Sequence, residues 1–209
     1  MSKYLSKFAY SNTVTEDLWD CLQESSGEPV RDVMSTWVNQ MGFPLVTFKR
    51  LSNTTIQLTQ EKYSANGPLD GCSYLWQIPI SFSSAKSPKI PIKTVVMSET
   101  AMIVEDAAFD DDWVKLNPGT FGFFRVKYDD LPNFNLEKLD TADRLQLQSD
   151  VYALGRAGYA PLTDYFKVLN QYKNETEYTI QEALQKFYSI VKNQSSFLIT
   201  SYHLFQQFV

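Results

Sequence analysis

Residues 1–43 carry their apolar side chains at helical spacing. Within Val30–Met41 the apolar residues recur every three or four positions, as in an amphipathic helix. Gly42 follows at the place of a helix C-cap, and Pro44 prevents the helix from continuing. Earlier in the chain, Thr13–Glu16 has the form of a capping box at the start of another helix. The pattern therefore predicts a helical segment over residues 1–43.

The middle of the chain changes to the two-residue period of β-strands. In residues 74–82 every second residue is large and apolar, which is the clearest strand signal in the sequence. Pro79 lies within this run and indicates an edge strand, because proline has no backbone N–H to donate. Further strands are predicted at 45–50, 55–61, 90–97, 101–105, 113–116 and 121–128. Short strands at this spacing predict an antiparallel β-sandwich over residues 45–131. We expect Trp113, Phe121, Phe124 and Val126 to lie in the sandwich core or at its junction with the helices, because the segment around Gly122 is too apolar for a free loop.

Residues 132–209 return to the helical period. Helices are predicted after Asp140 or Thr141, after Pro161, and from a second capping box at Thr179–Glu182. Short helices joined by short turns are typical of an α-solenoid. The predicted fold class is an α+β multidomain fragment, in which a β-sandwich lies between an N-terminal helical segment and a C-terminal, solenoid-like one.

The last residues, FLITSYHLFQQFV, are apolar up to the final position. Helical solenoids normally close with a polar outer face, so this end indicates a cut through a larger protein. The exposed apolar side chains would form a patch larger than a monomer usually shows. We therefore expect self-association through this C-terminal helical end, with candidate contacts at Phe197, Leu204, Phe205 and Phe208.

Composition and charge exclude several classes of partner. The chain has 209 residues, of which 44% are hydrophobic and 21% charged, and its net charge is −5. The acidic balance and the absence of a basic block argue against binding to nucleic acid or to an anionic membrane. No apolar run reaches the about 20 residues needed to span a bilayer, and the first residues lack a signal-peptide core. Cys21 and Cys72 are expected to be reduced thiols in a cytoplasmic protein.

The sequence provides no candidate catalytic, metal-binding, substrate-binding or cofactor-binding residue. Zinc hydrolases of the HExxH type need two histidines on one helical face, and this chain contains a single histidine, His203. Asp110–Asp112 could suggest a Ca²⁺ site, but three consecutive acidic residues point in different directions, and a solvated turn is the preferred interpretation. No phosphate-binding glycine motif is present.

Five stretches together resemble the puromycin-sensitive type of zinc aminopeptidase, in the gluzincin aminopeptidase family. They are residues 4–22, 33–48, 73–82, 113–129 and 143–158, in the family's order. The resemblance implies that residues 1–43 end a thermolysin-like catalytic domain, that 45–131 form a β-sandwich domain, and that 132–209 begin a C-terminal helical domain. It also implies that the zinc-binding motif, the motif that holds the substrate's free amine and the catalytic tyrosine lie upstream. Tyr4 does not match that tyrosine.

Two interpretations of function follow. In the first, the chain is a non-catalytic portion of a zinc aminopeptidase that removes N-terminal residues from peptides, and it positions the catalytic domain against the helical domain. Zinc and peptide substrates then belong to the parent enzyme, and the chain alone is expected to be inactive. In the second, the chain is an independent interaction or scaffold protein, or a truncated inactive paralogue. An HExxH motif upstream in the native reading frame would favour the first interpretation.

Overall fold

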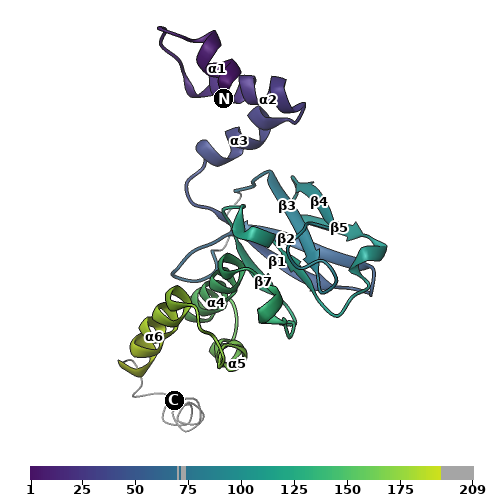
Figure 1. Ribbon diagram of the computed structural model, residues 1–209, viewed down its shortest axis with the longest axis vertical. Coiled ribbons are helices and arrows are strands. Elements are labelled where there is room, and N and C mark those ends of the chain that lie inside the picture. The colour runs from purple at the N-terminus through teal and green to yellow at the C-terminus, as the bar shows by residue number, and fades with distance from the viewer. Residues whose placement is uncertain (70, 72–73, 194–209) are drawn as a thin grey trace.

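The computed structural model describes residues 1–69, 71 and 74–193, with side chains described up to residue 186. Figure 1 shows three zones along the longest axis of the molecule. The N-terminal helices lie at one end, the strands occupy the middle, and the helices from α4 onward lie at the other end. The chain is thus an α+β protein whose sheets lie between two helical regions.

The N-terminal zone contains α1 (Ser2–Lys7), α2 (Thr15–Ser26) and α3 (Val30–Val38). The predicted capping box at Thr13–Glu16 is wrong by one residue. The Val14 N–H donates to the Asp17 carboxylate over 2.9 Å, whereas the Thr13 hydroxyl forms a hydrogen bond with the Tyr4 hydroxyl. Gly42 has the expected positive φ of 99°, but α3 ends earlier than its apolar stripe.

The strands are β1 (Pro44–Arg50), β2 (Thr55–Lys62), β3 (Ile78–Ser84), β4 (Lys93–Met97), β5 (Ala101–Glu105), β6 (Val114–Leu116) and β7 (Arg125–Tyr128). They form a four-stranded sheet in the order β5-β2-β1-β7 and a three-stranded sheet in the order β4-β3-β6. The expectation of a purely antiparallel arrangement is wrong, because β1 and β7 pair in parallel. A parallel pair needs a long crossover, and the chain builds both sheets before β7 returns beside β1.

The strand predicted at residues 74–82 is confirmed only in part, because β3 covers Ile78–Ser84 and Tyr74 is 40% exposed. The predicted alternation is confirmed from Trp76 to Phe82. Trp76, Ile78 and Ile80 are fully buried, and they belong to one hydrophobic cluster with side chains from the other sheet. The prediction of an edge strand is wrong, because β3 is the central strand of its sheet. Pro79 is nevertheless tolerated, since β6 pairs only with the second half of β3, from Phe82 to Ser84.

Residues 121–124 form a loop and not the predicted start of a strand. Phe121 was expected in the core, but 94% of it is exposed. The same expectation is confirmed for Trp113, Phe124 and Val126, each at most 5% exposed. Three short 3₁₀ helices also occur, η1 (Ala107–Phe109), η2 (Pro118–Thr120) and η3 (Leu136–Lys138). Loop 117–124 therefore has both buried and exposed aromatic residues.

The last zone contains α4 (Thr141–Arg156), α5 (Leu162–Gln171) and α6 (Tyr178–Asn193). Asp140 is the N-cap residue of α4 and Pro161 that of α5, as predicted. The second predicted capping box is wrong, because α6 begins at Tyr178 and Thr179 lies inside its first turn. α4 contacts β7, η2, α5 and α6, so it connects the sheets to the other helices. None of the helices described in the chain combines the length and apolar character needed to cross a membrane.

Candidate functional site

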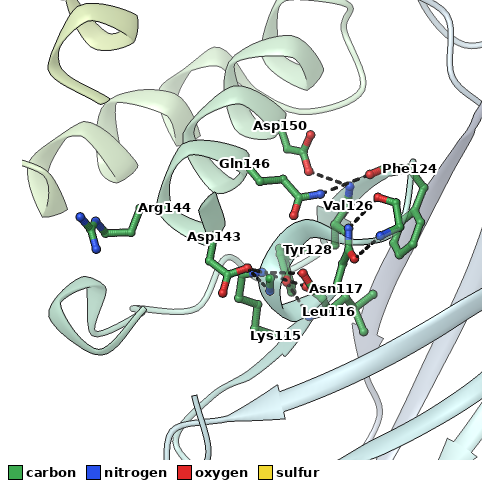
Figure 2. Close-up of polar contacts among 12 residues, drawn as sticks. Lys115, Leu116, Asn117, Phe124, Val126, Tyr128, Asp143, Arg144, Gln146 and Asp150 are labelled. Atoms are coloured by element: carbon green, nitrogen blue, oxygen red, sulfur yellow. Dashed lines mark hydrogen bonds and ion pairs between the residues drawn. The ribbon is translucent and has the colours of Figure 1, made fainter. Parts of the chain in front are cut away.

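A buried ion pair joins the second sheet to the start of α4. The Lys115 ammonium on β6 donates to Asp143 Oδ1 over 2.7 Å (Figure 2). Both side chains are enclosed, with 4% and 0% of their surface exposed. Lys115 also donates to the carbonyl oxygens of Leu116 and Asn117, at 3.0 and 3.3 Å. Burial lowers the pKa of Lys115, and the Asp143 carboxylate opposes that shift.

The Asp143 carboxylate also binds the turn that follows β6. Its Oδ1 atom also accepts a hydrogen bond of 2.9 Å from the backbone N–H of Gly119 in η2. Strand β6 and the turn that follows it are therefore held by one carboxylate in the first turn of α4. Removal of this carboxylate would leave a buried ammonium and a backbone N–H without their acceptor.

A second ion pair lies two helical turns further along α4. Asp150 accepts from Arg125 Nη1 over 2.7 Å and from the Val126 N–H over 3.0 Å. Burial raises the pKa of Asp150 to about 6, although Arg125 and the Val126 N–H both stabilise the ionised form. Because seven residues make about two turns, Asp143 and Asp150 share one face of α4. We call Lys115, Arg125, Asp143 and Asp150 the polar joint.

Neighbouring side chains complete the contact between α4 and the sheets. Gln146, between the two aspartates on the same helix face, donates to the Phe124 carbonyl over 3.3 Å (Figure 2). The Tyr128 hydroxyl accepts from the Leu116 N–H over 3.1 Å and thus links β7 to β6. Burial raises the pKa of the Tyr128 phenol, so it stays neutral at physiological pH. One helix face therefore fixes β6, β7 and the loop between them.

The loop between β6 and β7 is held in a strained conformation. The Asn117 amide donates to the Gly122 carbonyl over 2.9 Å and accepts from the Gly122 N–H over 2.8 Å. Asn117 and Thr120 have φ angles of 56° and 62°, which non-glycine residues rarely adopt. Thr120 is β-branched, so its conformation is costly and persists only because the surrounding contacts enforce it.

The opposite face of α4 holds the helices that follow. Arg144 points away from the polar joint (Figure 2) and forms two hydrogen bonds with the Glu175 carboxylate, at 2.7 and 3.2 Å. Burial would raise the pKa of Glu175, but hydrogen bonds from Arg144 and from backbone N–H groups outweigh it and lower the pKa. The Tyr172 hydroxyl donates to the Arg144 carbonyl over 2.6 Å. α4 is therefore fastened on both sides by buried polar groups.

The described residues do not form a metal centre. Among the residues that the structure describes, no group of three or more His, Cys, Asp or Glu side chains could hold a metal ion. His203 and Cys72 lie outside the described residues, and Cys21 is a buried free thiol. The interpretation of Asp110–Asp112 as a solvated turn is wrong for Asp111, whose side chain is 5% exposed and accepts backbone N–H bonds from Lys86 and Asp112.

Comparison with known proteins identifies the relatives of this architecture. The family model of the ERAP1-like C-terminal domain matches residues 113–209, which include the polar joint. Aminopeptidase M1-B of Oryza sativa subsp. japonica is 36% identical over 194 residues, 86% of this chain and 22% of the relative. The puromycin-sensitive aminopeptidase of Caenorhabditis elegans is 32% identical over 193 residues, 88% of this chain and 20% of the relative. The resemblance to aminopeptidases of the puromycin-sensitive type is confirmed.

A third relative is also matched over most of this chain but over only about a fifth of its own length. The alanine/arginine aminopeptidase of Saccharomyces cerevisiae is 32% identical over 197 residues, 92% of this chain and 22% of the relative. The chain spans about a fifth of the length of the curated relatives that it matches. The similarity to aminopeptidases thus concerns one part of much longer proteins.

No role for the polar joint follows from the sequence patterns, although its residues lie in two of the five stretches that carry the resemblance. The available signal was a charged residue inside an apolar segment, as for Lys115 in the predicted strand 113–116 and Asp150 beside Val151. A buried charge needs a partner. Periodicity does not reveal that partner, because Lys115 and Asp143 are separated by 28 positions.

Proposed function

We propose that this chain is the non-catalytic portion of a zinc aminopeptidase, and that it holds the catalytic part and the C-terminal helical part in a fixed relative position. In this proposal the two sheets form the β-sandwich of a multidomain enzyme. The parent enzyme removes N-terminal residues from peptides, with its zinc bound by residues outside this chain. The observation that carries the proposal is the polar joint, because its buried Lys115, Asp143 and Asp150 and its partly buried Arg125 connect one helix to both sheets.

Buried ion pairs suit a positioning role better than a purely stabilising one. Desolvation of the charges offsets much of their attraction, so such pairs add little net stability compared with apolar residues. The free energy of the protein rises steeply, however, when the two charges of a pair separate inside the protein, because each is then buried without a partner. Lys115 and Arg125 each meet a carboxylate at 2.7 Å, and both carboxylates also bind backbone N–H groups. A shift of α4 would lengthen several of these contacts at once.

The proposal predicts that the isolated chain has no peptidase activity and binds no stoichiometric zinc. Metal analysis of the purified protein, together with an aminoacyl-coumarin assay, tests this prediction. Turnover that a chelator abolishes would contradict the proposal.

We further propose a cytoplasmic location, with no nucleic-acid or membrane partner. Self-association through the C-terminal end remains a prediction for sedimentation analysis, because Phe197, Leu204, Phe205 and Phe208 lie outside the described residues.

The positioning role is tested in a chimera. In this chimera, the segment of rice Aminopeptidase M1-B that aligns with this chain, about a fifth of that enzyme, is replaced by this chain. We expect the chimera to be a chelator-sensitive aminopeptidase that unfolds cooperatively. In that chimera Lys115→Met should lower activity at least tenfold, because Asp143 loses its buried partner and α4 shifts. Lys167→Met is the matched control, since Lys167 pairs with Asp164 at the surface with 69% of its side chain exposed. Equal activity of the two variants would contradict a positioning role for the polar joint.

A further inference from the structure

Two aromatic residues stand out from loop 117–124. Phe121 is 94% exposed and Phe123 is 71% exposed, whereas the adjacent Phe124 is 5% exposed. Exposed side chains of this size, two positions apart, form a local apolar patch and not a single isolated contact. The core does not need either ring, so their exposure calls for an explanation outside the described chain's own packing.

The loop that carries these rings is built as a rigid support. The Asn117 side chain bonds both backbone groups of Gly122, and Asp143 holds the Gly119 N–H. A side chain at Gly119 would come within 2.6 Å of the Phe121 ring, and one at Gly122 within 2.3 Å of the Phe124 ring. The strained φ of Thr120 is a further sign of an enforced conformation. The hydrogen bonds of the loop thus hold the backbone from which the two rings project.

The rings border a groove of about 420 Å³ with mainly apolar lining. Its apolar lining residues are Phe43, Phe121, Phe123, Phe124, Ala142 and Leu145. Its charged lining residues, Arg125 and Asp150, already neutralise each other at 2.7 Å. The groove therefore favours an uncharged, apolar occupant.

We infer that this groove and its two phenylalanines dock the part of an aminopeptidase chain that lies outside the matched fifth, through an apolar and uncharged surface on that part. The inference rests on the proposed function. Its occupant follows from the proportions, because this chain covers only 20–22% of the aminopeptidases it matches. The position of the groove also fits this occupant. Phe123 packs on Phe43, with 5.1 Å between the ring centroids, and Phe43 lies in the link between α3 and β1, next to the proposed end of the catalytic part.

Hydrogen exchange in the chimera described above tests the inference. The amides of residues 119–124 should exchange at least tenfold more slowly in the chimera than in the isolated chain. Phe123→Ser should abolish most of this protection and speed proteolytic cleavage of the chimera about tenfold. Ile90→Ser is the matched control, because Ile90 is also 71% exposed but lies outside the groove. In the isolated chain both variants should keep the wild-type Tm within about 2 °C.

The outcomes separate the docking inference from the proposed function. An active chimera with unprotected amides at 119–124, or with equal effects of Phe123→Ser and Ile90→Ser, overturns docking alone. An inactive chimera that unfolds as two separate units overturns the proposed function and docking with it. NMR relaxation of the isolated chain provides an independent check. Order parameters below about 0.6 for residues 119–123 would overturn the inference, because a preformed support must be rigid.

Discussion

The N-terminal helices and α4 differ in how deeply their side chains are buried. α1, α2 and α3 together bury a single residue, Cys21. α4 alone buries seven residues, and Asp143, Gln148 and Asp150 are among them. The apolar stripe of α3 is regular, yet each of its side chains remains partly exposed. A regular stripe therefore does not guarantee burial, and a helix with polar residues on its inner face can be deeply buried when those residues find partners.

The two regions also differ in how they attach to the sheets. The helices α1–α3 are connected through hydrogen bonds with one short segment, residues 75–77. Trp37 Nε1 donates to the Gln77 carbonyl over 2.9 Å, and the Gln40 side chain bonds both backbone groups of Leu75. Trp37 also packs on Trp76, with 6.4 Å between the ring centroids, and is the α3 side chain that reaches the sheet core. By contrast, α4 contacts several elements through charged groups and through a hydrophobic cluster to which it contributes several buried side chains. We expect the N-terminal helices to open locally at a lower free energy than α4.

The largest expected effect follows removal of a buried charge from the polar joint. Asp143→Ala should lower the free energy of unfolding by about 3–5 kcal/mol, because Lys115 and the Gly119 N–H lose their acceptor. Urea unfolding measures the loss. The double variant Lys115→Met/Asp143→Leu is the control and should lose clearly less, since no unpaired charge remains. A loss below about 1 kcal/mol for the single variant would mean that water replaces the carboxylate and that the joint is open.

A similar loss is expected from the buried ring in loop 117–124. Phe124→Ala should cost about 3–5 kcal/mol, from lost transfer free energy and from the cavity left behind. Phe121→Ala is the matched control three positions earlier. Because Phe121 is 94% exposed, its truncation should change the free energy of unfolding by no more than about 0.5 kcal/mol in the isolated chain. Equal losses of unfolding free energy for Phe124→Ala and Phe121→Ala, measured in denaturant, would contradict a buried Phe124 and an exposed Phe121.

The raised pKa of the buried Asp150 carboxyl predicts an unusual pH dependence of stability. Its pKa rises in the folded state from 3.8 to about 6, mainly through burial. A raised folded-state pKa contributes stability that is complete below the unfolded value and is lost as pH rises through the folded value. Stability should therefore increase by about 1 kcal/mol as pH falls from 7 to 5, through the folded-state pKa of about 6.

Asp150→Asn should remove this increase, and urea unfolding of both proteins across the pH range measures it. Carboxylates with a lowered pKa, such as Glu175, act in the opposite direction but only as pH falls below their ordinary value of 4.5. A wild-type protein whose stability falls steadily from pH 7 to pH 5, in parallel with the variant, would show that Arg125 outweighs burial.

The smallest effect is expected in the N-terminal helices. Gln40→Ala removes two hydrogen bonds to Leu75, at 2.8 and 3.2 Å, and should lower the local opening free energy of α1–α3 by about 1 kcal/mol. Hydrogen exchange should become about fivefold faster in α2 and α3, with no change in β1–β3. Faster exchange across the sheets as well would show that the two regions unfold as one unit.

The sequence predicted most of the fold that depends on local pattern. The alternation from Trp76 to Phe82 is periodic over many residues, so it located a buried strand correctly. Asp140 and Pro161 marked helix starts because the preference for such residues at a helix N-terminus is local, although the Asp140 side chain makes no capping hydrogen bond. Two of the errors concern local pattern. The box at Thr13 was displaced because Asp17 competed with Glu16, and Phe121 was placed in the core because an apolar run does not show which rings face outward.

The resemblance to aminopeptidases was also present in the sequence itself, in five stretches that extend from residue 4 to residue 158. The polar joint was not, even though two of those stretches contain all of its residues. Only the tertiary structure brings Lys115 to Asp143 and Arg125 to Asp150, across 28 and 25 positions of the chain. The same holds for the parallel pairing of β1 with β7 and for the exposed rings of Phe121 and Phe123. Local periodicity reports the environment of a side chain through its neighbours in sequence. The partner of a buried charge is chosen by the path of the whole chain, because desolvation makes an unpaired charge too costly wherever the fold encloses it.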